Sequence, residues 1–210
     1  MNALWNPWVM AVALGLVTAG SMLLGPHNSD ALVIAGPDII PAPPSVIDDP
    51  PGATNDHQQA FNERQGVLLA APLAVDSGLI PTGTLVNSHM IFLNTDGSAF
   101  ASDTQTWTFD GIIVGVMSDN GGTLEAASSA LLGELGTIYP AAFPNRGLET
   151  NDSYIVAGNA ITLSDSVTEP GDWIRVITQA QRVPEPSTLL LLGTGTFGLL
   201  GLAWRRHRRR

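Results

Sequence analysis

The sequence predicts a mainly β protein, with a β-sandwich-like ectodomain and one short helix between two apolar terminal segments. Apolar runs rich in β-branched and aromatic residues recur through residues 60–180 and alternate with clusters of Gly, Pro, Asn and Asp. This is the pattern of short strands joined by turns. Uncharged stretches near both ends lower the charged fraction to 13%, against roughly 25% in ordinary soluble domains. The 210 residues leave room for one domain of ordinary size.

The first element is an apolar segment at residues 8–25 that contains no charged residue. It predicts a signal peptide over residues 1–31, which would form the N-terminal signal helix. Small residues at the positions that cleavage requires allow a cut after Gly20 or after Ala31, and the sequence leaves this choice open. Because no Lys or Arg precedes the apolar segment, an uncleaved N-terminal anchor or a buried helix is the alternative.

Residues 32–55 follow as a proline-rich stretch, and six prolines fall within residues 36–55. Proline lacks a backbone N–H and fixes φ, which disfavours helices and central strands. The segment is therefore predicted to be an extended linker.

The ectodomain is expected over residues 56–182. Five apolar runs indicate its strands, namely 66–75, 83–93, 104–117, 152–163 and 172–178. Within the third run the alternation breaks near Asp110 and Gly111, which suggests a β-bulge. A stretch rich in Ala and Leu predicts the single helix at about 123–135, with Thr123 as its cap and Gly136 at its end.

The charge balance excludes several functions. Residues 32–182 contain 17 acidic residues against four Arg, and the chain has no Lys and no Cys. An acidic domain repels phosphate backbones, so no nucleic-acid partner is expected. The lack of cysteine excludes disulfides, thiolate catalysis and Cys-based metal sites.

The C-terminus combines three features in a fixed order. A proline motif stands first, an uncharged segment at 187–204 second, and a basic tail at 205–210 last. At about 1.5 Å per residue the uncharged segment nearly spans a hydrocarbon core as a transmembrane helix, and the basic tail favours the cytoplasmic side. The motif residues are Val183, Pro184, Glu185, Pro186 and Ser187, and the basic residues are Arg205, Arg206, Arg208, Arg209 and Arg210.

This arrangement over residues 183–210 resembles the PEP-CTERM sorting signal of Gram-negative bacteria. The resemblance implies an exosortase as processing partner and a producer of exopolysaccharide. It also implies an inner-membrane-anchored intermediate with a cytoplasmic C-terminus, followed by a location at the cell surface or in the extracellular matrix. The alternative is a plain single-pass anchor. The middle of the chain resembles ectodomains of an uncharacterised PEP-CTERM family, which implies no activity; the similar stretches are 60–67, 86–94, 107–119 and 168–178.

Catalytic chemistry has weak support. His57 and His89 are the histidines outside the terminal segments, and we interpret them as a surface and a strand histidine. A Ser-His-Asp triad could draw on Ser88, Ser128 or Ser166, but no Gly-x-Ser-x-Gly elbow supports it. Carboxylates such as Asp110, Glu125 and Glu169 form no motif that singles out a pair for glycoside hydrolysis. We therefore expect no enzyme and no catalytic residue.

Two kinds of binding site remain as hypotheses. Oxygen-rich loops make calcium the one cofactor to consider, although ordinary turns explain the same residues; the candidate ligands are Asn94, Asp96, Asp103 and Asp119. Trp107, Trp173, Tyr139 and Tyr154 could stack on sugar rings but are as typical of core packing. The expected function is a non-enzymatic surface or matrix protein associated with exopolysaccharide. A carbohydrate-binding module and a hydrolase with an unrecognised site are the alternatives.

Overall fold

The structure, a computed structural model, describes residues 32–47, 55–95, 99–168 and 171–180. The predicted signal peptide, the sorting motif 183–187, the apolar segment 187–204 and the basic tail lie outside these residues. Asp96 and Glu169 lie outside them too.

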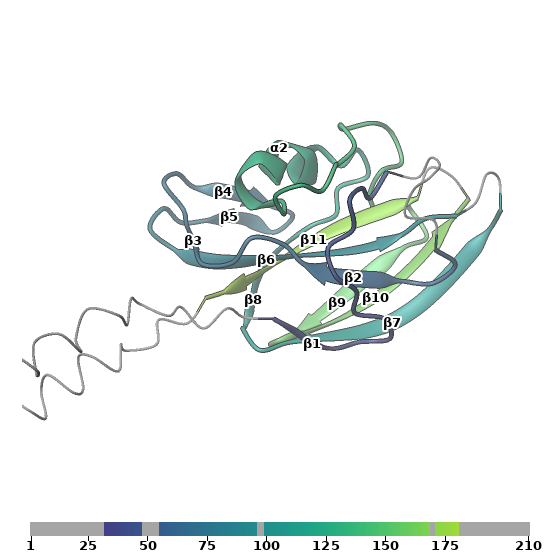
Figure 1. Cartoon of the computed structure of the whole chain (residues 1–210), viewed down its shortest axis with the longest axis horizontal. Coiled ribbons are helices and arrows are strands. Elements are labelled where there is room, and N and C mark those ends of the chain that lie inside the picture. The colour runs from purple at the N-terminus through teal and green to yellow at the C-terminus, as the bar shows by residue number, and fades with distance from the viewer. Residues whose placement is uncertain (1–31, 48–54, 96–98, 169–170, 181–210) are drawn as a thin grey trace, which may run out of the picture. The chain divides into compact units, whose positions relative to one another are not determined.

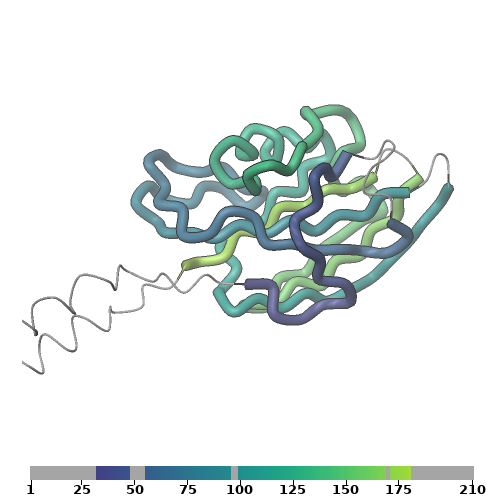
Figure 2. Tube along the Cα trace, viewed as in Figure 1, coloured from purple at the N-terminus to yellow at the C-terminus, as the bar shows by residue number. Residues whose placement is uncertain are grey.

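Two antiparallel sheets and a hairpin form the described domain (Figures 1 and 2). The four-stranded sheet has the order β1 (Val33–Ala35), β7 (Ala101–Phe109), β10 (Ala160–Val167) and β9 (Ser153–Ala157). The five-stranded sheet has the order β2 (Gln59–Asn62), β6 (Leu85–Leu93), β11 (Asp172–Gln179) and β8 (Ile113–Met117), with β3 (Val67–Leu68) also paired to β6. The hairpin joins β4 (Leu73–Val75) to β5 (Gly78–Ile80). The prediction of a mainly β domain is confirmed.

Side chains from both sheets share one apolar core. Alternate residues of a strand point to opposite faces, and the inward residues of the two sheets fall in a single buried cluster. The four-stranded sheet contributes Val33, Trp107, Phe109, Ile161 and Leu163. The five-stranded sheet contributes Ala60, Ile91, Val116, Ile174 and Val176.

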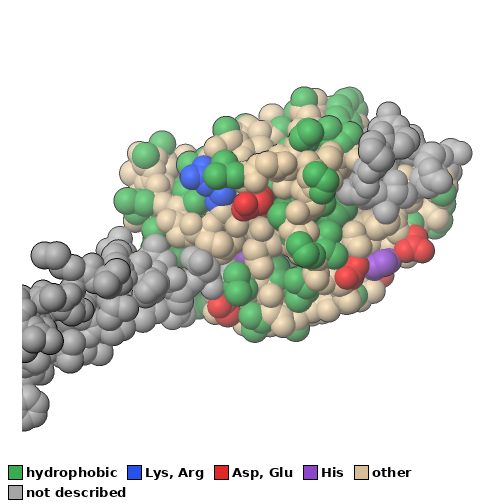
Figure 3. All heavy atoms as spheres, viewed as in Figure 1, with side chains coloured by type: hydrophobic (Ala, Val, Ile, Leu, Met, Phe, Trp, Pro, Cys, Tyr) green, Lys and Arg blue, Asp and Glu red, His purple; other side chains and the backbone are tan. Residues whose placement is uncertain are grey.

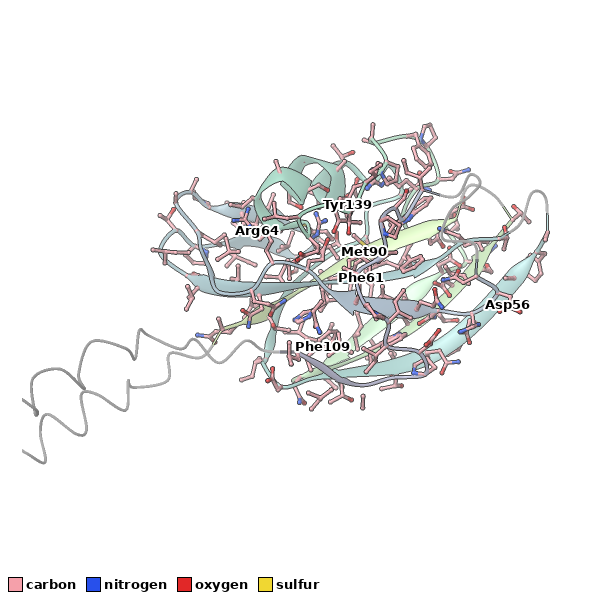
Figure 4. All side chains as sticks on the ribbon, viewed as in Figure 1. Asp56, Phe61, Arg64, Met90, Phe109 and Tyr139 are labelled. Carbon is pink, nitrogen blue, oxygen red and sulfur yellow. The ribbon has the colours of Figure 1, made fainter. Side chains whose placement is uncertain are left out.

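The other face of the five-stranded sheet is covered as well. The helix α2 (Thr123–Leu132) and the β4–β5 hairpin lie over it in Figure 1. Beneath them Val86 and Ile177 of the sheet pack with Leu132 of the helix and Val75 of the hairpin. A second cluster on this face includes Met90, and Figure 4 shows Met90 close to Phe61 and Tyr139. Strands β6 and β11 are therefore buried on both sides, and polar residues within them, such as His89 and Arg175, are buried together with the apolar ones.

The helix was predicted at the right place, with different ends. It stops at Leu132, and the Gly133 N–H bonds back to the Ser129 carbonyl at 2.9 Å. Thr123 is the first helical residue and not the cap. The Asp119 carboxylate instead accepts from the N–H groups of Thr123 and Leu124, at 2.8 and 2.9 Å, and satisfies two of the free donors at the helix start.

Three predicted runs each hold two strands. Residues 66–75 contain all of β3 and β4, and residues 152–163 contain β9 and the start of β10. The run 104–117 is divided at Asp110 and Gly111 between β7 and β8, which belong to different sheets. The predicted bulge at this point is wrong, because the chain leaves one sheet for the other there.

Residues 32–47 differ from the predicted linker, because they lie against the sheets. Strand β1 pairs with β7, the Ile40 N–H donates to the Ala60 carbonyl at 2.9 Å, and Val46 is fully buried. Proline keeps the segment extended, as expected, but the residues between the prolines retain donors and acceptors that bond to the domain. The domain therefore includes residues that the sequence analysis placed before it.

Gly36 offers a test of this packing. A Cβ at Gly36 would overlap the Trp107 ring, which is fully buried and donates from Nε1 to Gln58 Oε1 at 2.8 Å. Since the ring has no room to withdraw, we expect Gly36→Ala to destabilise the domain by roughly 1–3 kcal/mol in denaturant unfolding. The control Ile34→Ala, at an exposed position of β1, should change stability much less. Equal stability of Gly36→Ala and the wild type would contradict the packing.

Candidate functional site

A buried polar cluster lies between the five-stranded sheet and α2, and its centre is Arg175 on β11. The Arg175 Nε and Nη2 groups donate to the two carboxylate oxygens of Glu63, each at 2.7 Å. This is the bidentate geometry that favours arginine over lysine. Nη1 donates to the Glu125 carbonyl at 2.6 Å and to Ser128 Oγ at 2.7 Å. One strand side chain thus joins the segment after β2 to the helix.

The Glu125 carboxylate joins Arg175 to a second buried arginine. Its Oε1 is 3.1 Å from Arg175 Nη2, and its Oε2 pairs with Arg146 Nη2. Arg146 Nη1 donates to the Pro140 carbonyl. The side chains of Glu63, Arg175, Glu125 and Arg146 are at most 1% exposed, so the alternating charges are closed to solvent.

Aromatic rings complete the enclosure of both guanidinium groups. Arg175 lies 5.3 Å from the ring centroid of Tyr139, and Arg146 lies 5.8 Å from that of Trp173. Burial, with Arg175 nearby, lowers the pKa of Arg146 to about 10, which leaves it charged at neutral pH. Burial also raises the pKa of the Tyr139 hydroxyl. With its four charged side chains buried, this network positions α2 on the sheet.

His89 is a buried structural residue. Asn62 Oδ1 accepts from the Val33 N–H at 2.9 Å, which identifies this atom as the amide oxygen. His89 Nδ1 therefore donates to Asn62 Oδ1 at 2.9 Å. The other ring nitrogen, Nε2, then accepts from the Thr178 hydroxyl at 3.0 Å. The centroid of the imidazole also lies 4.6 Å from that of the Phe109 ring, with the two ring planes tilted by 42°. Burial lowers the pKa of His89 to about 3, so the ring stays neutral near neutral pH.

His57 lies at the surface between two carboxylates. Its Nδ1 is 2.7 Å from Asp56 Oδ1 and its Nε2 is 3.1 Å from Asp38 Oδ2. These hydrogen bonds, first to Asp56 and then to Asp38, raise the pKa of His57. Both ring nitrogens are engaged, so the arrangement links residue 38 to residue 57 and leaves no nitrogen for a substrate.

The serines named as nucleophile candidates are held by other groups. Ser88 precedes His89 but points to the opposite face of β6, where its hydroxyl donates to Glu63 Oε2 at 2.5 Å. Ser128 bonds to Arg175, and Ser166 bonds to Asp152 at 3.0 Å. The structure therefore brings none of the three serines to either histidine.

The described calcium candidates each have a separate structural role. Asp119 caps α2, as described above. Asp103 accepts from the Gln58 N–H at 2.9 Å and from Gln105 Nε2 at 2.7 Å, and Asn94 donates to the Val46 carbonyl at 3.1 Å. Among the described residues, no group of three or more His, Asp or Glu side chains could hold a metal ion.

The candidate sugar-stacking rings are not displayed for a ligand. Trp107 and Trp173 are 0% and 1% exposed, and Trp173 Nε1 donates to the Val46 carbonyl at 2.6 Å. Tyr154 packs against the core and bonds to Asp76 at 3.1 Å. The ring face of Tyr139 lies against the guanidinium group of Arg175, as described above. The two tryptophans in particular are core residues.

Two carboxyl groups are buried between the sheets, at the end where β10 leads to β11. Asp165 Oδ1 accepts from Gln58 Nε2 at 2.9 Å, whereas Oδ2 of Asp165 and of Asp172 have no hydrogen-bond partner among the described residues. Burial raises the pKa of Asp165 to about 7 and that of Asp172 to about 9, and the negative charge of Asp152 adds to both. Sequence analysis missed this pair, because each acid stands alone in its strand.

Comparison with known proteins identifies the C-terminal segment. A protein-family model for the PEP-CTERM protein-sorting motif matches residues 182–210. The match confirms, for this C-terminal segment, the resemblance to the PEP-CTERM sorting signal seen in the sequence. No curated protein and no solved structure is significantly similar to the chain. Within the described residues, no helix is long and apolar enough to cross a membrane.

We predict that the Glu63–Arg175 pair is strongly coupled. Arg175→Met leaves Glu63 buried without its cation, and loss of one partner of a buried pair costs about 3–5 kcal/mol. The double variant Glu63→Gln with Arg175→Met removes both charges and should recover a large part of that loss. Denaturant unfolding of both single variants and the double variant gives the coupling free energy. Simple addition of the two single effects would contradict the network.

The buried aspartates predict a pH effect. The pKa of Asp172 in the folded state, about 9, is above the ordinary aspartate value of 3.8, so its contribution to stability is fully present below about pH 4 and is lost as the pH rises through about 9. Asp172→Asn is always neutral and should unfold at a higher temperature than the wild type at pH 9, with a difference that shrinks towards pH 4. The exposed control Asp110→Asn should show no such trend. A difference independent of pH would refute the assignment.

Proposed function

We propose that this protein is an exported, non-enzymatic protein of the cell surface or extracellular matrix, sorted and processed by an exosortase. The observation that carries the proposal is the PEP-CTERM sorting motif at residues 182–210. Such a motif is linked with export and a membrane-anchored intermediate. The facing sheets favour a sandwich-like ectodomain as the exported cargo.

The order of residues at the C-terminus supports the orientation of this intermediate. The apolar segment 187–204 stops in the membrane, and the five arginines that follow resist translocation. The segment 183–187 would then emerge on the exported face. Two prolines at Pro184 and Pro186 favour an extended backbone there, which is the conformation a protease requires. Cleavage would release the acidic domain from its anchor.

A role without catalysis is supported by the state of the candidate groups. His89 is neutral and enclosed, both nitrogens of His57 are engaged, and the serines bond elsewhere. A carbohydrate-binding module, the first alternative, would have used aromatic rings of which Trp107 and Trp173 are buried. Association with exopolysaccharide in the matrix stays part of the proposal, without an assigned contact surface.

Processing can be tested with two tags on one chain. The first is inserted between Ser77 and Gly78, in the exposed turn of the β4–β5 hairpin, and the second follows Arg210. In a host with the cognate exosortase the tags should appear on separate fragments, and the domain tag should be found outside the inner membrane. Deletion of the exosortase should keep both tags on one membrane species.

A matched variant distinguishes sorting from simple anchoring. Pro184→Ala with Pro186→Ala leaves the apolar segment and the arginines unchanged, and it should block separation of the tags without loss of membrane association. If both tags remain on a full-length membrane species in the competent host, residues 183–210 act as an anchor only and the processing proposal fails.

A further inference from the structure

Strand β9 leaves one edge of the four-stranded sheet open. It pairs with β10 over Ser153–Ala157, and it is the last strand in the sheet order. Among the described residues, the backbone of these five residues has no hydrogen bond besides those to β10. The outward N–H and C=O groups of β9 are thus available to another strand.

At the edge strands β1, β2 and β8, outward backbone groups form hydrogen bonds within the protein. At β1, the Val33 N–H donates to the Asn62 side chain. At β2, the Ala60 N–H donates to the Asp38 carbonyl at 3.0 Å. At β8, the Val116 carbonyl accepts from the Asp76 N–H at 2.9 Å. Strand β9 therefore differs from β1, β2 and β8, whose outward backbone groups make at least one such bond each.

The side chains of β9 lack the features that usually protect an edge. Proteins guard such strands with charged residues, proline or bulges, and the sequence SYIVA contains neither charge nor proline. Its pairing with β10 is regular. Ile155 is 71% exposed and Val156 is 39% exposed. Apolar side chains at an open edge favour pairing with a further strand, because the new contact buries them.

We propose that β9 pairs with β9 of a second copy of this chain, antiparallel and about a two-fold axis, so that two four-stranded sheets become one of eight strands. An antiparallel edge is complementary to its own copy, because every second residue directs both its N–H and its C=O outward, and the symmetry-related strand offers the matching acceptor and donor. The strand is also free of charge in a strongly acidic domain, so two copies approach there without facing carboxylates within the paired strands. This inference concerns assembly and does not depend on exosortase processing.

The two-fold axis predicts which residues meet. When all five residues pair, Ile155 faces Ile155 of the other copy, and Ser153 faces Ala157. Directly opposed residues in antiparallel strands have Cα atoms about 4.5–5.5 Å apart, which is within disulfide reach. The chain contains no cysteine, so a single introduced cysteine reports on one position only.

The first experiment compares two single-cysteine variants of the full chain in an exosortase-competent host. Ile155→Cys should form a disulfide-linked dimer under mild oxidation of the exported protein. The control is Thr162→Cys, since Thr162 pairs with Ile155 on β10 and lies one strand in from the edge. It should give at least tenfold less dimer. Equal crosslinking of the two variants would indicate contact through the sheet face and overturn edge pairing.

The second experiment introduces like or opposite charges on the two sides of the two-fold axis. Ile155→Lys places two like charges opposite each other and should weaken self-association by about tenfold or more, measured by analytical ultracentrifugation. Ile155→Glu should do the same. A mixture of the two variants should associate again, because each lysine then faces a glutamate.

Both variants alter a solvent-exposed residue, and circular dichroism verifies that they fold like the wild type. A wild-type protein that stays monomeric at concentrations of up to about 100 μM overturns the proposal. So does a Lys and Glu mixture that associates no better than either variant alone.

Discussion

The position of α2 on the five-stranded sheet depends on one guanidinium group. Arg175 reaches from the centre of the five-stranded sheet to Glu63 and to the backbone of α2. An arginine buried without partners would be prohibitively costly, and its attraction to carboxylates offsets the desolvation only when nearly all of its donors are used. Here each of the three guanidinium nitrogens donates to an oxygen. The helix therefore has one position on the sheet at which this charge is compensated.

The same constraint explains how the scarce positive charge of the domain is used. Between residues 32 and 180 the sequence has three arginines, and Arg146 and Arg175 are both buried beside Glu125. Arg146 comes from the irregular segment after α2, and a Cβ at Gly122 would overlap its side chain. Glycine is favoured at this position for two reasons. It adopts the φ of 59° that the turn into the helix requires, and its lack of a side chain leaves room for Arg146. In a cysteine-free chain, ion pairs and packing tie distant segments together in place of disulfides.

Local features of the chain were predictable, whereas contacts between distant residues were not. The β class and the position of α2 follow from composition and periodicity over a few residues. Glu63 and Arg175 are separated by 112 positions, and nothing near either residue indicates the other. The division of residues 104–117 between two sheets was missed because a turn at Asp110 and Gly111 resembles a bulge in sequence. Trp173 could not be assigned to core or surface from alternation, since β11 is buried on both faces.

This difference in range also explains why the sorting signal can be read from the sequence when the ectodomain cannot. Translocation and proteolysis act on a chain segment through its apolar length, its terminal charge and its backbone extension, and all three are properties of consecutive residues. Recognition by a folded domain depends instead on which side chains the fold leaves at the surface. Here the fold encloses His89, Trp107 and Trp173, which were candidates for catalysis or sugar binding, and it leaves exposed the short apolar strand β9, which had no distinguishing motif. For this protein, binding surfaces therefore have to be sought among the side chains that the buried ion-pair network and the two sheets leave exposed.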